Sequence, residues 1–167
     1  VSRFKPGDRV AALTGWGAFA EEVVAPESNL LPIPDSMSDE KAAAFMMVYG
    51  TSYYALKQRG NLQPGETLLI HGGTSGIGTT AIQLARHFGV RVITTAGSDE
   101  KCDACRALGA ERTVNYRDED FAAAALAFTD GIGVNVVLDM VGGDYIGRNI
   151  EALAVDGRLA QIAFLQG

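Results

Sequence analysis

The strongest chemical signal in the sequence is a glycine-rich segment, Leu69–Gly78, which reads LIHGGTSGIG. An apolar run precedes it and a helix-like run follows it, and in that context a G-x-G-x-x-G pattern indicates a dinucleotide site. Gly73, Ser75 and Gly78 occupy the three pattern positions, and Gly76 adds a further small residue. Small residues let the backbone approach a pyrophosphate, which the free N–H groups at the helix N-terminus can bind. The segment therefore predicts a nucleotide-binding turn, and it is not a P-loop because no Gly-Lys-Ser/Thr follows.

The residues after the next apolar run bear on which dinucleotide is bound. NAD enzymes usually place an acidic residue about 20 residues past the glycine motif, where it binds the ribose 2′-hydroxyl, and Asp99 lies 21 residues after Gly78. Asp99 also stands where a helix begins, however, and acidic residues are common in a first helical turn. Gly97 and Ser98 form a small, hydroxyl-bearing loop, and Lys101 lies on the next helical turn, which suits a 2′-phosphate. The pattern favours NADP over NAD.

Other groups of residues in the sequence are weaker indications of a metal or catalytic site. Cys102 and Cys105 form a C-x-x-C pair, but a structural zinc site needs four ligands and the chain has two cysteines. Both lie inside a predicted helix, so we expect them to be packing residues. His71, at the end of a predicted central strand, is expected to be a buried histidine with its hydrogen bonds made. Trp16 is open to two interpretations, a turn residue or part of a substrate-side wall. These residues predict no metal site and identify no catalytic residue.

Secondary-structure elements must position these residues, and from Thr67 onward short apolar runs alternate regularly with helical patterns. Continuous apolar runs are typical of strands that are buried on both faces of a parallel sheet. The alternation predicts an α/β domain, a Rossmann-type doubly wound parallel sheet with at least five strands. The expected strands are Thr67–His71, Arg91–Thr95, Arg112–Asn115, Val134–Asp139 and Arg158–Ala163, and the expected helices are Gly76–Phe88, Asp99–Leu108, Asp118–Phe128 and Tyr145–Leu153.

The first part of the chain has a different pattern, in which glycine and proline separate short apolar runs. The expected strands there are Arg9–Leu13, Ala18–Val24 and Leu30–Ile33, each bounded by turn residues. Ser38 then resembles a helix N-cap. The helix that it opens is expected to run to about Arg59, with a kink at Gly50.

Length and composition limit the class of protein. At about 150 residues per domain, the 167 residues predict about one domain, or one domain and a piece of another. No apolar run approaches the roughly 18 residues that a membrane span needs. The net charge of −6 argues against a nucleic-acid or anionic-membrane surface, since both need a basic patch. Two cysteines fit a reducing compartment, so we expect a cytoplasmic protein. Because the last run, Arg158–Ala163, reads as a core strand, we also expect the chain to be a fragment.

Several motifs, in order and spacing, resemble those of one superfamily. They include Gly50-Thr51-Ser52-Tyr53-Tyr54-Ala55-Leu56, Ala81-Ile82-Gln83-Leu84-Ala85, Leu108-Gly109-Ala110, Asn115-Tyr116, Leu138-Asp139-Met140-Val141-Gly142-Gly143 and Asp156-Gly157-Arg158. Together with the glycine-rich segment they resemble the medium-chain dehydrogenase/reductase superfamily, and within it the zinc-independent NADPH:quinone oxidoreductase branch. The resemblance covers essentially the whole chain.

This resemblance implies two domains and a redox activity. Residues 1–38 would be the C-terminal part of a GroES-like catalytic domain, and residues 39–167 would be an NADP-binding Rossmann domain that is incomplete at its C-terminal end. The intact protein would transfer a hydride from NADPH to a small-molecule quinone or enone, without zinc, and would form a homodimer. The fragment itself is expected to be inactive.

The resemblance also implies which residues surround the cofactor. Ser75, Gly76 and Ile77 would hold the pyrophosphate, with Ser75 standing where glycine or alanine is common in the family. The adenosine 2′-phosphate and its ribose would be surrounded by Gly97, Ser98, Lys101 and Tyr116. Met140 and Val141 would form a cofactor-lining turn, and the nicotinamide side would be lined by Thr51, Tyr54, Ala163 and Phe164.

Two alternatives to the quinone reductase stay open. Within the superfamily, the parent enzyme could be an enoyl reductase or a zinc-type alcohol dehydrogenase, and the latter would show bound zinc and activity with simple alcohols. Outside the enzyme class, the chain could be a module that binds NADPH without turnover.

Overall fold

The computed structural model describes residues 3–167. The chain separates into two compact units, Val1–Val48 and Tyr49–Gly167. Residues 1 and 2, where the predicted first domain begins, lie outside the described residues. The assignment of domains to residues 1–38 and 39–167 stays a prediction.

The first unit is built around a two-stranded antiparallel pair, β1 (Val10–Ala12) and β2 (Leu30–Pro32), with the short 3-10 helix η1 (Glu27–Asn29) leading into β2. Both strands lie where the sequence predicts them. The third predicted strand, Ala18–Val24, is wrong, because this stretch consists of bends and irregular backbone. A strand needs a partner for its N–H and C=O groups. Here the side chains of Phe19 and Val24 are fully exposed to solvent instead of packed on a neighbour.

The long helix α1 (Asp39–Tyr53) begins as predicted. The backbone N–H of Lys41 donates to the Ser38 hydroxyl at 3.4 Å, so Ser38 caps the helix. The α-helix continues through Gly50, because a single glycine weakens a helix without breaking its hydrogen-bond ladder. The irregularity comes four residues later, where the chain continues as a π-helix, η2 (Tyr54–Arg59).

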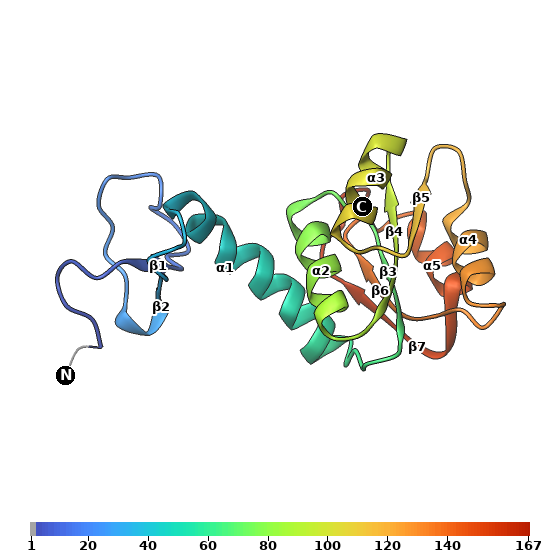
Figure 1. Cartoon of the computed structure of the whole chain (residues 1–167), viewed down its shortest axis with the longest axis horizontal. Helices are drawn as coiled ribbons and strands as arrows, with labels where there is room; N and C mark the ends of the chain where they lie inside the picture. Colours follow the sequence, from blue (N-terminus) through green and yellow to red (C-terminus); the bar gives the residue numbers. More distant parts are fainter. Residues whose placement is uncertain (1–2) are drawn as a thin grey trace. The chain divides into compact units, whose positions relative to one another are not determined.

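The second unit contains the predicted parallel sheet of five strands (Figure 1). The strands are β3 (Thr67–Ile70), β4 (Arg91–Ala96), β5 (Arg112–Asn115), β6 (Val134–Asp139) and β7 (Leu153–Gln161), in the order β5-β4-β3-β6-β7. The chain runs outward from β3 to β5 and then returns to the other side of β3, so the strand order reverses between β3 and β6. In open parallel sheets, ligands bind beyond the carboxyl ends of the strands at such a reversal.

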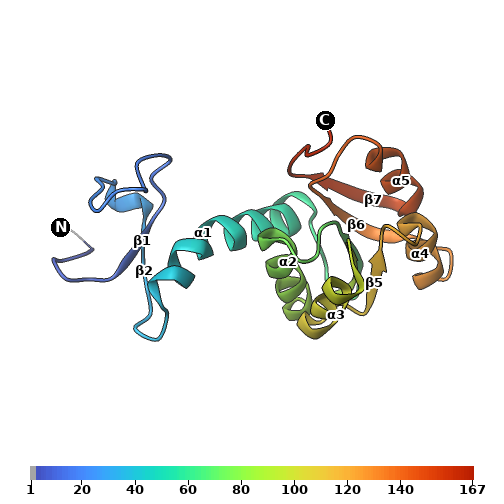
Figure 2. The same cartoon turned by 90° about the horizontal axis from the view of Figure 1, so that it is seen from above.

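Helices cover both faces of the sheet (Figure 2). They are α2 (Gly76–His87), α3 (Asp99–Leu108), α4 (Phe121–Phe128) and α5 (Tyr145–Ala152). Leu68 and Ile70 of β3 belong to the core under α2, α3 and η2, whereas Leu69 belongs to the core under α4 and α5. Successive residues of a strand point to opposite faces, so each strand must be apolar on both. The three layers confirm the predicted doubly wound fold.

Two element boundaries differ from the sequence prediction by more than two residues. α4 begins at Phe121, not at Asp118, because the Asp120 carboxylate caps it by accepting from the backbone N–H of Ala123 at 2.8 Å. β7 covers Leu153–Gln161, not Arg158–Ala163. The chain passes from α5 directly into β7, and the pairing of β7 with β6 shifts register before Arg158.

Arg158 connects the edge strand β7 to the segment before β3 by hydrogen bonds. Its guanidinium donates to both carboxylate oxygens of Glu66, at 2.9 and 2.7 Å, and to the carbonyls of Gly60 and Asn61. Hydrogen bonds to charged groups contribute more than neutral ones. We therefore expect Arg158→Met to lower the free energy of unfolding by about 2 kcal/mol, measured by urea denaturation. Arg91→Met, which removes a more exposed ion pair with Glu111, is the control and should cost less than about 1 kcal/mol.

This difference in stability should depend on pH. The hydrogen bond from Arg158 is the main cause that holds the pKa of Glu66 below its ordinary value of 4.5. A depressed carboxyl pKa stabilises the fold above the unfolded pKa, and that stability is lost as pH falls through the folded pKa. The gap between the wild type and Arg158→Met should therefore be full at pH 7 and narrow below about pH 4. A gap that stays constant down to pH 3 would contradict the ion pair.

Candidate functional site

The glycine-rich turn connects the end of β3 to the start of α2 and leaves no room for a side chain at Gly73 or Gly78. A Cβ atom on Gly78 would lie 2.2 Å from the carbonyl oxygen of Gly72. A Cβ on Gly73 would lie 2.4 Å from the Thr94 hydroxyl oxygen and 2.7 Å from the Cys105 sulfur. All three distances are shorter than those of real Cβ contacts, so the turn favours glycine at these two positions. The backbone itself is therefore the surface that a ligand would meet.

Ser75 is the N-cap of α2. Its side chain accepts a hydrogen bond from the backbone N–H of Gly78 at 2.9 Å, and its hydroxyl lies 3.5 Å from the sulfur of Met140. The Ser75 hydroxyl thus caps the N-terminus of α2. The N–H groups of Gly76 and Ile77, in the first turn of α2, remain as donors because the first N–H groups of a helix have no partner within it. They lie where the positive end of the helix dipole favours an anion.

A second turn follows β6 and carries Met140 and Val141. It is joined to the segment after β7, since the N–H of Leu165 donates to the Met140 carbonyl at 3.3 Å and that of Gln166 to the Val141 carbonyl at 2.9 Å. A Cβ on Gly142 would lie 3.3 Å from the Cα of Phe164. The structure therefore brings together predicted cofactor residues from the glycine-rich turn, the turn after β6 and the segment after β7.

A second group of predicted residues meets at the carboxyl ends of β4 and β5. The Tyr116 hydroxyl lies 2.6 Å from where a Gly97 Cβ would be, so the tyrosine ring lies over the glycine. Ser98 caps α3 by accepting from the N–H of Lys101 at 3.3 Å. Asp99 accepts from the Asn115 side chain at 3.1 Å. Lys101 is exposed at the surface of α3, where its charge is available to a ligand.

Thr51 and Tyr54 line a separate groove with a volume of about 520 Å³. Its other wall is the end of β7, with Gln161 and Ile162. The Gln161 amide nitrogen donates to the carbonyl of Ala163 at 2.6 Å, while its amide oxygen is buried without a hydrogen-bond partner. The groove thus places the two predicted helix residues opposite the strand end that precedes Ala163.

A buried hydrogen-bond chain beneath these turns was not predicted from the sequence. It runs through the side chains of Thr95, His71, Asn149 and Asp139, all of which are 0–1% exposed. His71 Nδ1 lies 3.1 Å from the Thr95 hydroxyl, and His71 Nε2 lies 2.7 Å from the Asn149 amide oxygen. Burial lowers the pKa of His71, so the ring is neutral. The expectation that His71 is a buried histidine with its hydrogen bonds made is confirmed.

The two cysteines are buried and free, which confirms that they are packing residues. Burial raises the pKa of the Cys105 thiol to about 11. Among residues 3–167 there is no group of three or more histidine, cysteine, aspartate or glutamate side chains that could hold a metal ion. Among the same residues, no helix has the length and apolar character needed to cross a membrane.

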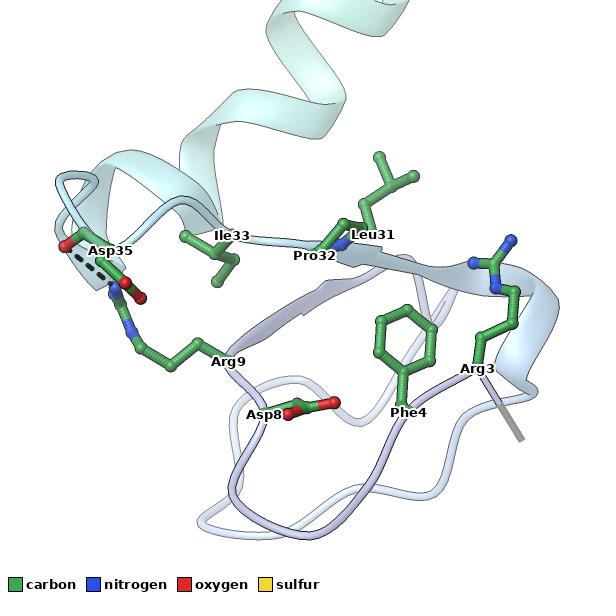
Figure 3. Close-up of a pocket in the computed structure, with 8 residues that line it drawn as sticks. All are labelled: Arg3, Phe4, Asp8, Arg9, Leu31, Pro32, Ile33 and Asp35. Carbon is green, nitrogen blue, oxygen red and sulfur yellow. Dashed lines mark hydrogen bonds between the residues drawn. The ribbon is translucent and has the colours of Figure 1, made fainter. Parts of the chain in front are cut away.

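The first unit has a hollow of its own, lined by eight residues that include Arg3, Phe4, Asp8 and Arg9 (Figure 3). The guanidinium of Arg3 donates to the Leu30 carbonyl at 3.1 Å. That of Arg9 donates to three backbone carbonyls between residues 34 and 37 and to Asp39. Both cations thus bind groups of the chain itself, and no predicted cofactor residue lines the hollow. Trp16, in the loop after β1, is 86% exposed.

Known proteins resemble this chain over its whole length. A family model described as zinc-binding dehydrogenase matches residues 76–167. Quinone oxidoreductase-like protein 2 from Bos taurus is 40% identical over 168 residues, which cover 100% of this chain and 48% of that protein. The chain spans about half the length of the quinone oxidoreductase-like relatives that it matches.

Two solved structures show the same fold. A quinone oxidoreductase from Pseudomonas syringae has a TM-score of 0.92 at 40% identity, covering 99% of this chain and 51% of that chain. The quinone oxidoreductase from Thermus thermophilus, whose structure was also determined as a complex with NADPH, has a TM-score of 0.89 at 36% identity. That match covers 98% of this chain and 52% of the other.

Proposed function

Because the chain belongs to the zinc-binding dehydrogenase family of the medium-chain dehydrogenase/reductase superfamily, we propose that it is the NADPH-binding part of an oxidoreductase that reduces a quinone or a conjugated carbonyl. Homology to oxidoreductases supports the enzyme class. That the hydride acceptor is a quinone or a conjugated carbonyl, and that the reaction needs no zinc, are parts of this proposal.

One observation of this structure carries the proposal, namely the glycine-rich turn at the reversal of the strand order. Gly73 and Gly78 have no space for a Cβ, and α2 begins there with its N-terminus at the same edge of the sheet. A pyrophosphate fits this cradle, because it would bind backbone N–H groups where no side chain intervenes. Lys101 and Ser98, beyond the next strand, would hold the 2′-phosphate that distinguishes NADPH from NADH.

When bound, NADPH supplies the hydride, and the residues of this chain bind and orient the cofactor. Quinones and conjugated carbonyls accept a hydride readily, so positioning and exclusion of water contribute most to the rate. The zinc that the family description implies does not fit the described residues, since they offer no cluster of three or more ligands and both cysteines are buried among packed helices and strands.

The proposal is tested by turnover of the full-length protein that carries this sequence. NADPH oxidation should be followed by absorbance with a benzoquinone and with an enone, and NADP+ reduction should be followed with a simple alcohol, each before and after treatment with a chelator. Reduction of quinone or enone that survives chelation supports the proposal. Tight NADPH binding without oxidation above background would favour a binding module instead, and a chelator-sensitive reaction with the alcohol would favour a zinc-type alcohol dehydrogenase.

The preference for NADPH is expected to depend on Lys101. Removing its charge with Lys101→Ala should weaken NADPH binding about tenfold and leave NADH binding nearly unchanged, as measured by isothermal titration. Lys57→Ala is the matched control, because the Lys57 amine donates to the Leu62 carbonyl; it should change neither affinity. Equal losses for the two cofactors in Lys101→Ala would show that Lys101 does not meet the 2′-phosphate.

A further inference from the structure

The buried hydrogen-bond chain joins four structural elements at the place where the strand order reverses. Thr95 lies in β4, His71 directly follows β3, Asn149 lies in α5 and Asp139 ends β6. Beyond the contacts of His71, the Asn149 amide nitrogen donates to Asp139 Oδ2 at 2.9 Å. Phe121 and Tyr145 enclose the His71 ring edge to face, with centroids 4.6 and 4.9 Å away. These rings shield the hydrogen bonds from water.

Each end of the chain of hydrogen bonds holds one of the two turns that line the candidate cofactor site. At one end, the Thr95 hydroxyl accepts from the N–H of Gly72 at 3.2 Å. At the other, Asp139 accepts from the N–H of Val141 at 2.6 Å and from that of Gly142 at 3.3 Å. The glycine-rich turn and the turn after β6 are therefore fastened to a common set of buried side chains.

The chemistry of Asp139 fixes the direction of every hydrogen bond in this set. A carboxylate only accepts, so Asn149 must turn its NH₂ group toward Asp139 and its carbonyl oxygen toward His71. His71 Nε2 must then carry the ring proton in order to donate to that oxygen. In a neutral imidazole the other nitrogen is an acceptor, so Nδ1 receives the Thr95 hydroxyl proton. The Thr95 oxygen is left to accept from Gly72.

We propose that Thr95, His71, Asn149 and Asp139 are positioning residues that hold the two cofactor-lining turns in the geometry for dinucleotide binding, with His71 kept as the Nε2–H tautomer by Asp139. The set touches no ligand and acts through the backbone of the two turns. A buried donor that loses its partner costs free energy, so a break at any point loosens a turn that the cofactor must then order. The proposal rests on the proposed function, since it concerns the affinity for NADPH.

The first test removes the hydrogen bonds of the Thr95 hydroxyl to His71 and to the N–H of Gly72, and it measures NADPH affinity by titration. Thr95→Val keeps the shape of the side chain and removes the hydroxyl, and it should weaken NADPH binding about tenfold. Thr95→Ser restores the hydroxyl and should stay within about twofold of the wild type. Thr129→Val is the matched control, because the Thr129 hydroxyl also accepts from a glycine N–H, that of Gly133 at 2.9 Å, at the opposite edge of the sheet.

Thr129→Val should lower the melting temperature as Thr95→Val does and leave NADPH affinity unchanged. Thr95→Val that binds NADPH as tightly as the wild type would overturn the proposal. So would a Thr129→Val variant that loses as much affinity, because the effect would then be one of general stability.

The second test needs no cofactor and reads the tautomer of His71 directly. Long-range ¹H–¹⁵N correlation spectra at neutral pH should show His71 protonated at Nε2. In Asp139→Asn, the new amide must keep its oxygen toward the N–H of Val141, so Asn149 should flip and His71 should change to the Nδ1–H form. A wild-type Nδ1–H signal, or no change in Asp139→Asn, would contradict the proposed direction.

The two tests separate this proposal from the proposed function. If the wild-type chain binds no NADPH, the proposed function fails while the tautomer measurement still decides the direction of the hydrogen bonds. If the wild type binds NADPH and Thr95→Val binds it equally well, the positioning role fails and the function stands.

Discussion

Gly78→Ala is expected to abolish measurable NADPH binding. The added Cβ would lie 2.2 Å from the Gly72 carbonyl oxygen and 2.8 Å from the backbone of Gly73. Because these neighbours are backbone atoms of the same turn, no side chain can rotate away, and the turn itself must move. We expect a loss of affinity of at least about 100-fold, which corresponds to roughly 2.7 kcal/mol, together with a lower melting temperature.

The control for this prediction is another helical glycine that has space around it. Gly147 lies in α5, and a Cβ there would meet nothing within 4 Å. Gly147→Ala should leave NADPH affinity unchanged and raise stability by about 0.5–1 kcal/mol, because alanine is the better helix former. Titration calorimetry and thermal denaturation of both variants check the pair. Wild-type affinity in Gly78→Ala would show that the turn is not the pyrophosphate cradle.

Phe121→Ala should be the most destabilising single change in the core of the second unit. The Phe121 side chain is fully buried. Its ring lies edge to face with His71, stacks on Tyr145 at 5.0 Å and carries the Arg148 guanidinium 4.0 Å above its centroid. Truncation removes these contacts and leaves a cavity, so we expect a loss of about 3–5 kcal/mol in the free energy of unfolding.

Two further variants calibrate this loss in the same denaturation experiment. Phe121→Leu keeps most of the volume and should cost about 1.5 kcal/mol. Ile132→Ala removes a side chain that is 72% exposed and should change stability by less than about 0.5 kcal/mol. A Phe121→Ala variant as stable as Ile132→Ala would mean that the core under α4 and α5 does not depend on this ring.

The sheet of the second unit could be predicted because its signals are local. Leu68, Leu69 and Ile70 are all apolar since β3 is covered by helices on both faces. The helices α2, α3 and α4 each begin after a capping side chain. The prediction failed for Ala18–Val24, where an apolar pattern alone cannot supply the partner that a strand requires. It also placed the start of α4 at Asp118, whereas the helix begins at Phe121 because Asp120 supplies its cap.

Part of the candidate site could likewise be predicted from the sequence, and part of it could not. The glycine-rich turn could be recognised because its residues are adjacent in sequence and stand between a strand and a helix. The pairing of His71 with Asn149 could not, because 78 residues separate them and their meeting depends on the order of the strands. The Asn149 side chain gave no signal in the sequence beyond being polar within a helix. The assignment of individual residues to contacts with NADPH stays a prediction.

The close packing around Gly73 has a consequence for protein engineering. Residue 73 is confined from two directions, by Thr94 of β4 and by Cys105 of α3, so trimming the cysteine to alanine would not make space for a side chain there. Position 73 should therefore accept only glycine whatever residue stands at 105, and a larger residue at 105 would push directly on the turn. Redesign of the cofactor preference should start at Asp99, Glu100 and Lys101 in the first turn of α3, whose side chains are exposed to solvent.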